Sequence, residues 1–524
     1  MDYSDKQRLS FVLLVNIIGG LLVGYIIGYV PVTLTFQADL SNCTKYTTSD
    51  ACNSQPKLCG WQGGYVDARN ITRQPRCGFV HEPFRGCEII PTKDICTASS
   101  DCFWQSQDNL CAHNPEWSQV LTGAFSGMMI IGGMIGSFPA GMLLAKLGRK
   151  RMISLTGAIG AVATVFCIIG WSINDTAHLS NYGMMMVGRL LAGIAVGLAC
   201  CVCPMYCGEM APSRWASAAG CSFQVSLTFG IFFVALLGYI IDATGSYSQN
   251  IHQQNRFQII NALQLLFGVL LIPVGFYVAE PSAEATGTVN QDESAGLLKN
   301  EDVPLSSLKT NFMAAVALAA AQQLTGINAV MNYAPQITTN FGLPSLRGNV
   351  VVMAWNFVTT IASIKIATLF STGMMYVGSA TIASLACLLT AIPIFPSVFP
   401  SGDKVGYGLT GAGVFIFVAA FEMGMGPAFY VLAQSIFPAS RRSFGCSFTV
   451  VVQFIFNLII NFCFPVAVQG ISGGPDEDQR KGMAVVFVFF GVVGIVCTFA
   501  LFWNLRSQTK EDEEAQDGTY ANAE

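Results

Sequence analysis

The sequence has few charged residues. Of its 524 residues, 11% are Asp, Glu, Lys or Arg, whereas an average soluble domain has roughly 25%. The chain therefore lacks the charge needed to cover a globular surface, and it has only four histidines. This shortage excludes a soluble enzyme, a nucleic-acid-binding protein and a secreted disulfide protein as descriptions of the whole chain. The net charge of −4 adds little, because the distribution of charge matters more than its sum.

Long apolar segments occur where charge is missing. Hydrophobic residues make up 52% of the chain, the mean hydropathy is +0.51, and a helix that crosses a bilayer needs about 20 mainly apolar residues. The sequence predicts an all-α polytopic membrane protein with twelve transmembrane helices in two six-helix halves. The helices are expected at 10–33, 118–145, 152–172, 182–207, 216–241, 257–279, 310–338, 348–369, 373–396, 406–432, 443–468 and 482–504.

Basic residues indicate how these helices are oriented. Basic residues are concentrated in one set of short loops and at the termini, whereas the short loops on the opposite side hold little more than Arg347, Lys404, Arg480 and Lys481. Loops rich in Lys and Arg stay in the cytoplasm. We therefore expect both termini to be cytoplasmic.

Polar segments divide the chain into parts. Residues 280–309 form a predicted cytoplasmic linker between an N-terminal half, 1–279, and a C-terminal half, 310–504. A transporter built from two repeats has its linker at this place. Residues 505–524 are predicted to form an acidic cytoplasmic tail.

The predicted outer loop 39–117 is rich in cysteine. An even number of cysteines in a short segment on the oxidising side indicates disulfides, here four bridges with 105 possible pairings. A metal site is the alternative, but the loop has no Cys-x-x-Cys pair. The eight cysteines are Cys43, Cys52, Cys59, Cys77, Cys87, Cys96, Cys102 and Cys111, and the predicted glycosylation sites on the outer side are Asn42, Asn70 and Asn174. These features favour the secretory route and the plasma membrane.

Several polar side chains lie inside the apolar segments. Most are amides, which donate and accept hydrogen bonds, as a neutral polyhydroxyl ligand requires. The alternative is that they hold helices together, at about 0.6 kcal/mol each. Because they come from both halves, we predict a ligand site near the middle of the membrane. They are Gln224, Gln322, Gln323, Asn328, Asn356, Gln453 and Asn457, accompanied by Tyr333 and Glu422.

The tenth predicted helix contains Gly424-Met425-Gly426-Pro427. Pro427 lacks an amide hydrogen and clashes with the preceding turn, so a regular helix is not expected there. Gly424, Gly426 and Pro427 are a predicted hinge, and a passive kink is the alternative.

Four motifs resemble the sugar porter family of the major facilitator superfamily. They are Gln322-Gln323-Leu324-Thr325-Gly326-Ile327-Asn328 followed by Tyr333, Gly188-Arg189 with the later Pro204 to Pro212, Gly220 to Gly230 around Gln224, and Gly141 to Lys150. The resemblance covers all twelve predicted helices. The long cysteine-rich outer loop further resembles that of kinetoplastid glucose transporters.

The resemblance implies roles for particular residues. The amides and Glu422 fall on sugar-contacting or pocket positions, with Gln453 in place of an Asn, Tyr430 in place of a stacking Trp, and Phe421 as part of the wall. The family closes its cytoplasmic face with ion pairs, and the matching residues are Arg149, Lys150, Glu209, Arg214, Glu280, Arg441 and Arg442. The second-half part of this charge cluster is eroded, since Phe370-Ser371-Thr372 stands where the family has Gly-Arg-Arg.

By this resemblance the protein is expected to be a facilitative hexose transporter and not an enzyme. A proton-coupled symporter and a sugar sensor with little transport are the alternatives. Proton symporters of the family have an Asp after Gly-Tyr in the first helix, whereas Gly24-Tyr25 is followed here by Ile26. The expected partners are a sugar and the lipid bilayer, with no cofactor, metal or nucleic acid. Glucose, fructose and a polyol all remain open as the substrate.

Overall fold

The computed structural model describes most of the chain. The described residues are 3–40, 59–62, 65–66, 72–73, 76–79, 102–105, 110–113, 119–172, 179–244, 253–281, 305–328, 330–331, 345–400, 403–473 and 480–521. The predictions that fall outside them concern most of the linker 280–309, of which residues 282–304 are not described, and Tyr333, Asn42, Asn70, Asn174, Cys43, Cys52, Cys87 and Cys96.

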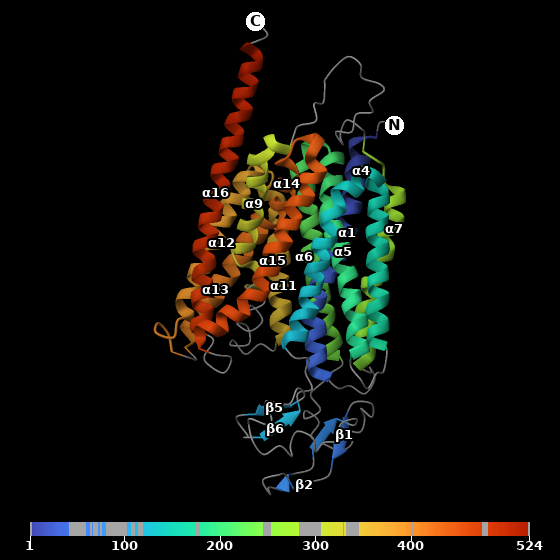
Figure 1. Cartoon of the computed structure of the whole chain (residues 1–524), viewed down its shortest axis with the longest axis vertical. Helices are drawn as coiled ribbons and strands as arrows, with labels where there is room; N and C mark the ends of the chain where they lie inside the picture. Colours follow the sequence, from blue (N-terminus) through green and yellow to red (C-terminus); the bar gives the residue numbers. More distant parts are fainter. Residues whose placement is uncertain are drawn as a thin grey trace.

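Long helices packed side by side form the body of the protein (Figure 1). In the first half they are α1 (Asp5–Leu40), α4 (Gln119–Ser172), α5 (Leu179–Met210), α6 (Ala216–Thr244) and α7 (Gln253–Tyr277). In the second half they are α9 (Lys309–Leu324), α11 (Ser345–Ile366), α12 (Thr372–Ile394), α13 (Lys404–Ala420), the π-helix η4 (Phe421–Met425), α14 (Gly426–Ser435), α15 (Arg442–Ser472) and α16 (Arg480–Ala521). Short 3-10 helices lie at η2 (Ser213–Trp215), η3 (Leu305–Leu308) and η5 (Ala439–Arg441).

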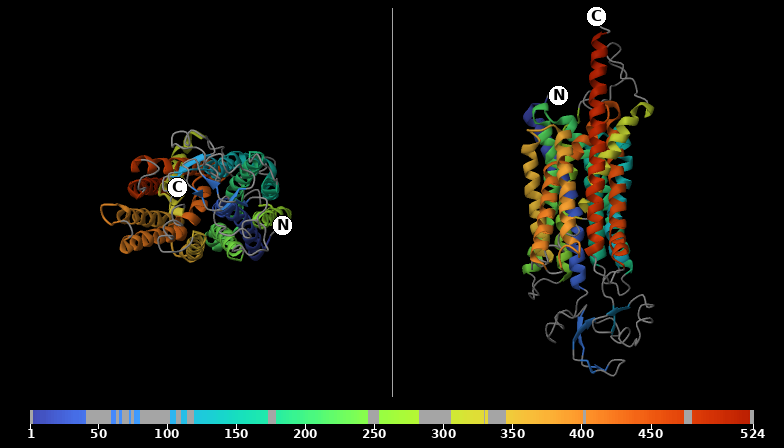
Figure 2. Two further views of the ribbon diagram at one scale, coloured as in Figure 1. Left: turned by 90° about the horizontal axis from the view of Figure 1, so that it is seen from below. Right: turned by 90° about the vertical axis from the view of Figure 1, so that its left-hand side faces the viewer.

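The two sets of helices lie next to each other. In the end-on view, the first-half helices gather on one side and the second-half helices on the other (Figure 2). Both chain ends lie at one end of the bundle, and the strands lie beyond the opposite end (Figure 1). Between the two sets, α4 packs against α15, and α6 packs against α11 and α14.

Ten helices among the described residues are long and apolar enough to cross a membrane. One of them, α4, covers both the second and the third predicted spans as two helices joined at a kink, where Gly148 has the non-helical φ of 78°. The seventh predicted span is represented by α9, which has only 16 residues. The number of twelve transmembrane helices remains a prediction.

The outside of the bundle is apolar. Large hydrophobic side chains point away from the core, among them Phe138, Phe276 and Trp503, which are 71%, 70% and 65% exposed. A soluble protein rarely exposes apolar area on this scale, whereas lipid chains accept it. The inside is held together by close helix contacts. At Gly132 and Gly193, where α4 meets α5, a Cβ atom would lie 2.2 and 2.1 Å from a backbone oxygen of the other helix, so only glycine allows this approach.

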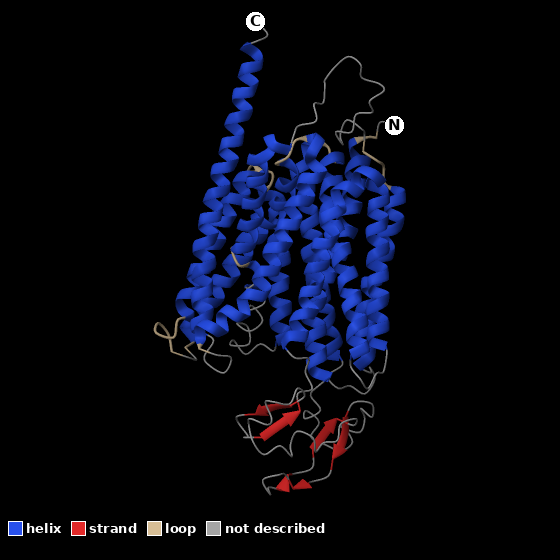
Figure 3. Ribbon diagram, in the orientation of Figure 1, coloured by secondary structure: helices blue, strands red, loops and turns tan. Residues whose placement is uncertain are grey.

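Strands occur only in the predicted outer loop among the described residues (Figure 3). Three antiparallel pairs form there: β1 (Cys59–Gln62) with β4 (Arg76–Phe79), β2 (Tyr65–Val66) with β3 (Thr72–Arg73), and β5 (Cys102–Gln105) with β6 (Leu110–His113). The first and third pairs share a register in which Trp61 faces Cys77 and Trp104 faces Cys111. An all-α description therefore holds for the bundle and not for this loop.

The last helix extends further than the apolar segment. The expected span ended at 504, but α16 continues to Ala521 through the predicted acidic tail. An established helix can extend residue by residue without a new nucleation step, and the tail contains good helix formers such as Lys, Glu, Gln and Ala.

Candidate functional site

A buried carboxylate joins helices from both halves. Glu422 of η4 is 3% exposed. Its Oε1 accepts a hydrogen bond from Nδ2 of Asn356 on α11 (3.0 Å). Its Oε2 accepts from Nε2 of Gln224 on α6 (3.0 Å) and from Oγ1 of Thr360 on α11 (3.1 Å). The sequence predictions Gln224, Asn356 and Glu422 thus lie together, and Gln224 makes the link across the two halves.

The π-helix η4 carries this carboxylate. Pro427 has no amide hydrogen, and the amide of Gly426 donates to the carbonyl of Phe421, five residues earlier. The predicted irregularity is therefore a wide turn, and the helix continues as α14. Gly424 and Gly426 are needed for close packing. A Cβ at Gly424 would lie 2.2 Å from Oγ of Ser379, and one at Gly426 would lie 3.0 Å from Nε2 of Gln224.

The seventh predicted span is interrupted beside its two glutamines. Helix α9 ends at Leu324 because Gly326 has φ +89°, a conformation that favours glycine. Gln322 and Gln323, just before the interruption, are each 4% exposed. Oε1 of Gln323 accepts from Nδ2 of Asn328 (2.7 Å). Broken helices at the middle of a membrane are common at transporter binding sites.

Seven buried amide oxygens accept no hydrogen bond from the described residues, four of them on Asn16, Asn261, Gln264 and Asn349. The other three belong to residues predicted for the site: Oε1 of Gln322, Oδ1 of Asn356 and Oε1 of Gln453. A buried polar atom without a partner costs about 1–3 kcal/mol, and native proteins contain few of them. These three come from α9, α11 and α15 of the second half. They are candidates to accept hydrogen bonds from a ligand.

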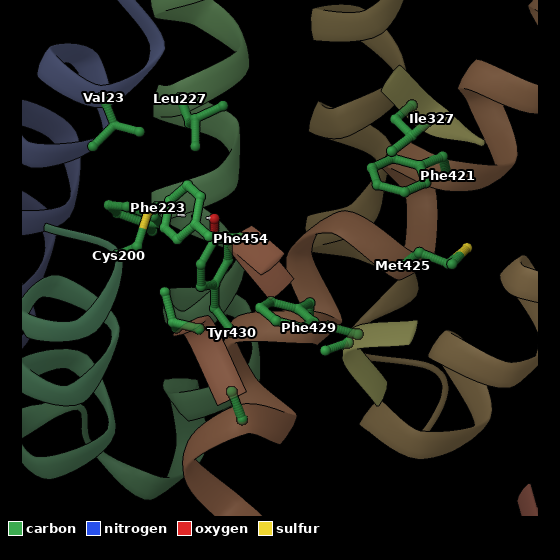
Figure 4. Packing of buried hydrophobic residues seen from close by; sticks show 14 of the residues in the cluster. Val23, Cys200, Phe223, Leu227, Ile327, Phe421, Met425, Phe429, Tyr430 and Phe454 are labelled. Carbon is green, nitrogen blue, oxygen red and sulfur yellow. Dashed lines mark hydrogen bonds between the residues drawn. The ribbon is translucent and has the colours of Figure 1, made fainter. Parts of the chain in front are cut away.

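Aromatic side chains lie near these amides. The ring of Tyr430 on α14 makes edge contacts with Phe223 of α6 (5.1 Å between centroids) and with Phe429 (5.3 Å). Its hydroxyl lies 3.6 Å from Sγ of Cys200 on α5, so Tyr430 bridges the two halves (Figure 4). Phe421 stacks on Phe417 at 6.3 Å.

Asn457 is placed differently from the other predicted amides. It is partly exposed, and its Oδ1 accepts from Nδ2 of Asn461 one turn later on α15 (2.5 Å). This contact lies within one helix, and Asn457 makes no hydrogen bond to the Glu422 group among the described residues. Its role in binding remains a prediction.

Part of the predicted charge cluster is assembled at the kink of α4. Arg149 donates to both carboxylate oxygens of Glu209, from Nη2 to Oε1 (2.6 Å) and from Nε to Oε2 (2.9 Å). Glu280 accepts from the backbone amides of Arg149 (2.6 Å) and Lys150 (3.1 Å). These amides follow Gly148, where a helical segment starts, so they have no earlier carbonyl partner and favour an anion.

Arg442, at the start of α15, also acts on this group, because its charge lies close enough to stabilise the Glu209 carboxylate. Arg214 is exposed and lies over the ring of Trp215 at 5.5 Å. Nε of Arg442 is buried without a hydrogen-bond partner, and Arg441 lies in η5. The structure thus joins Arg149 and the Lys150 backbone to Glu209 and Glu280.

Sequence reasoning missed two members of the buried site. Thr360 lies one helical turn after Asn356 on the same face of α11, and this i, i+4 spacing could have indicated it. Cys200 could not have been found in this way, because it meets Tyr430 only through the packing of α5 on α14. No group of three or more His, Cys, Asp or Glu side chains in the described part of the chain could hold a metal ion.

Comparison with known proteins agrees with this fold. The family model "Sugar (and other) transporter" matches residues 12–505. "Glucose transporter 2A" of Trypanosoma brucei brucei is 36% identical over 512 residues, which are 96% of this chain and 89% of that protein. "Membrane transporter D2" of Leishmania donovani is 32% identical over 507 residues, 95% of this chain and 89% of the relative.

Solved structures share the architecture. A structure of XylE, described as a major facilitator superfamily proton:xylose symporter bound to 6-bromo-6-deoxy-D-glucose, has a TM-score of 0.66 and 17% identity. It covers 95% of this chain and 96% of its own. A partially occluded inward-open form of XylE from E. coli has a TM-score of 0.61 and 18% identity, with coverage of 94% and 97%. The chain therefore belongs to the sugar transporter family and has the major facilitator fold of an integral, multi-pass membrane protein.

Proposed function

We propose that the protein is a facilitative hexose transporter of the glucose type, which moves sugar by alternating access between its two halves. The observation that carries the proposal is the set of unpartnered amide oxygens on Gln322, Asn356 and Gln453. Each sugar hydroxyl both donates and accepts, so a hexose can satisfy buried amides without bringing a charge into the membrane.

The link across the halves supports alternating access. Gln224 of the first half bonds to Glu422 of the second, and Tyr430 contacts Cys200 and Phe223 of the first half. A ligand held by both sets of helices can favour one arrangement of the halves over another, provided that it binds the two arrangements unequally. Gly424, Gly426 and Pro427 are the proposed hinge, because η4 is the irregular part of this helix.

The relatives support the substrate class. Two of them are named glucose transporters and come from Trypanosoma brucei brucei. We infer a hexose for this chain from their names together with the neutral polar lining. Gln322, Gln323, Asn328, Asn356 and Gln453 are the proposed sugar contacts.

The charge cluster is a proposed lock at the cytoplasmic face. Arg149, Glu209 and Glu280 tie α4, α5 and the end of the first half together. Because the second-half part of the cluster is eroded, with Arg442 still acting on Glu209, we propose that the first half supplies most of this stabilisation. We also propose that both termini are cytoplasmic and that the strand-containing loop lies outside the cell, where its eight cysteines form disulfides. The proposed membrane is the plasma membrane.

Uptake of labelled glucose by cells that lack their own hexose carriers tests the function. We expect saturable uptake that glucose competes for and that Gln322→Ala weakens. The Asp403→Asn variant is the control, since Asp403 caps α13 through the amide of Gly406 (2.7 Å) and an Asn oxygen can replace it. Surface expression without uptake would reject the transporter and favour the sugar sensor.

Proton-coupled symport is the second candidate, because Glu422 is a buried carboxylate at the site. The first helix argues against it. Ile26 stands where symporters have an Asp, and Nη1 of the fully buried Arg189 donates to the Ile26 carbonyl (3.2 Å). We expect uptake that follows the sugar gradient and survives a protonophore. Sugar-dependent proton influx into deenergised proteoliposomes would instead establish symport.

A further inference from the structure

The hydrogen bonds of Glu422 restrict how its neighbours are turned. A carboxylate only accepts hydrogen bonds, whereas an Asn or Gln amide has one donating end and one accepting end. Glu422 contacts Asn356 through Oε1 and Gln224 through Oε2, both at 3.0 Å. Each amide must therefore turn its NH2 group toward Glu422, because the reverse orientation would bring two acceptor oxygens together.

The other end of each amide faces away from Glu422. For Asn356 this end is Oδ1, which is buried and accepts no hydrogen bond from the part of the chain that the structure describes. The Thr360 hydroxyl lies on the Oε2 side of the carboxylate (3.1 Å) and shares its single hydrogen with the Asn356 carbonyl (2.7 Å), so the two full donors to Glu422 are Asn356 on Oε1 and Gln224 on Oε2. Asn356 is thus held as an acceptor toward whatever fills the site.

Gln323 is held in the opposite sense. Its Oε1 already accepts from Asn328 (2.7 Å), which leaves the NH2 group of Gln323 as the end that can meet a ligand. The site therefore has a fixed polarity, with accepting amides next to Glu422 and a donating amide at Gln323.

We propose that Glu422 is a positioning residue that sets this polarity, so that the sugar hydroxyl at Asn356 must donate its hydrogen. The inference rests on the proposed hexose transport and adds a rule for substrate choice. A hydroxyl that must donate cannot be replaced by fluorine, because a C–F group accepts weakly and has no hydrogen to give.

Deoxy and deoxyfluoro hexoses provide the probes. At a position whose protein partner only accepts, the fluoro and deoxy sugars should bind equally poorly. At a position whose partner donates, fluorine should recover part of the affinity. A site built to pair a hydroxyl rejects analogues that lack it, and we expect a penalty of tenfold or more relative to the parent sugar at each paired position.

Alanine variants show which sugar position faces which amide. A deoxy sugar that lacks the hydroxyl facing Asn356 should bind the Asn356→Ala variant as well as the parent sugar does, which identifies that hydroxyl. Gln224→Ala identifies the hydroxyl that faces Gln224 in the same way. Affinity is measured as competition against labelled glucose for each sugar and variant. The ratio of fluoro to deoxy affinity is taken within one variant, so that differences in expression cancel.

Glu422→Gln is the decisive variant, because it keeps the shape and replaces one acceptor with a donor. Whichever way the introduced amide turns, its NH2 group faces either Asn356 or Gln224, so one of these two side chains must reverse. In the wild type we expect a fluoro-to-deoxy ratio near one at both mapped positions. In Glu422→Gln we expect the ratio to rise several-fold at one of them. Asp403→Asn makes the same chemical change outside the site and should leave every ratio unchanged.

The outcomes separate this inference from the proposed function. If no hexose binds or is carried by the wild type, the proposed function fails. If hexoses are carried but fluorine recovers affinity at the Asn356 position in the wild type, the inferred polarity is wrong. If the ratios in Glu422→Gln match those of the wild type, Glu422 does not set the polarity.

Discussion

The ion pair between Arg149 and Glu209 permits a quantitative prediction. The two side chains are 5% and 1% exposed, and Arg149 donates two hydrogen bonds to one carboxylate. An exposed pair would contribute about 0–1 kcal/mol, whereas removing one member of a buried pair costs about 3–5 kcal/mol, since it leaves a buried charge without its partner. Because both side chains are buried, we expect the larger loss of free energy of unfolding.

We therefore expect Glu209→Gln to lower the free energy of unfolding by about 3 kcal/mol or more. That is a large share of the roughly 5–15 kcal/mol typical of native proteins. The double variant Arg149→Gln/Glu209→Gln should be more stable than the sum of the single effects predicts, because neither member of the pair is left as a buried charge without the other.

The assay is equilibrium unfolding of the purified protein in mixed micelles, for the wild type, both single variants and the double variant. Asp403→Asn is again the control for changing a carboxylate to an amide. Buried partners should show a coupling energy of at least about 1 kcal/mol, and residues without contact add within about 0.3–0.5 kcal/mol. Additive single effects would refute the reasoning, since the pair would then behave as an exposed one.

Three further predictions concern other parts of the molecule. Gln322→Ala should weaken hexose binding about tenfold or more while surface expression is kept, because a sugar hydroxyl loses its partner; loss of expression at unchanged affinity would indicate a structural glutamine. Gly326→Ala should lower the melting temperature, since its Cβ would lie 2.6 Å from the Phe490 ring at a φ of +89°, whereas Gly378→Ala, where nothing lies within 4 Å, should not. The eight outer-loop cysteines should resist alkylation until a reductant is added; rapid labelling without reductant would contradict the disulfide framework.

The bundle could be predicted well from the sequence. Apolar segments without charge appear as helices at the expected places, because a bilayer requires each span to satisfy its own backbone hydrogen bonds. The interruption of the seventh span could not be predicted. A glycine can adopt either sign of φ, and the positive φ of Gly326 occurs where the chain packs against Phe490 of α16, which is 164 residues away in the sequence.

Most residues of the site could be predicted from the sequence, but the hydrogen bonds between them could not. Polar residues inside apolar segments identified Gln224, Asn356 and Glu422, since such residues are costly and usually functional. Their hydrogen bonds depend on packing between helices that lie far apart in the chain, as with Gln224 and Glu422, which are 198 residues apart. Thr360 was overlooked because a threonine in a membrane helix commonly bonds to its own backbone, and this one does so as well (2.7 Å to the Asn356 carbonyl).

The π-helix η4 also determines how the following helix, α14, is rotated about its axis. A π turn spans one more residue than an α turn, and each residue of an α-helix advances it by about 100°. The extra residue in Phe421–Met425 therefore determines in which direction each side chain of α14 points around the helix axis. Deleting one residue there would leave the composition and hydrophobicity of the helix almost unchanged. It would nevertheless rotate the face that carries Tyr430 away from Phe223 and Cys200, so the length of this turn, as much as any side chain in it, encodes how the two halves meet.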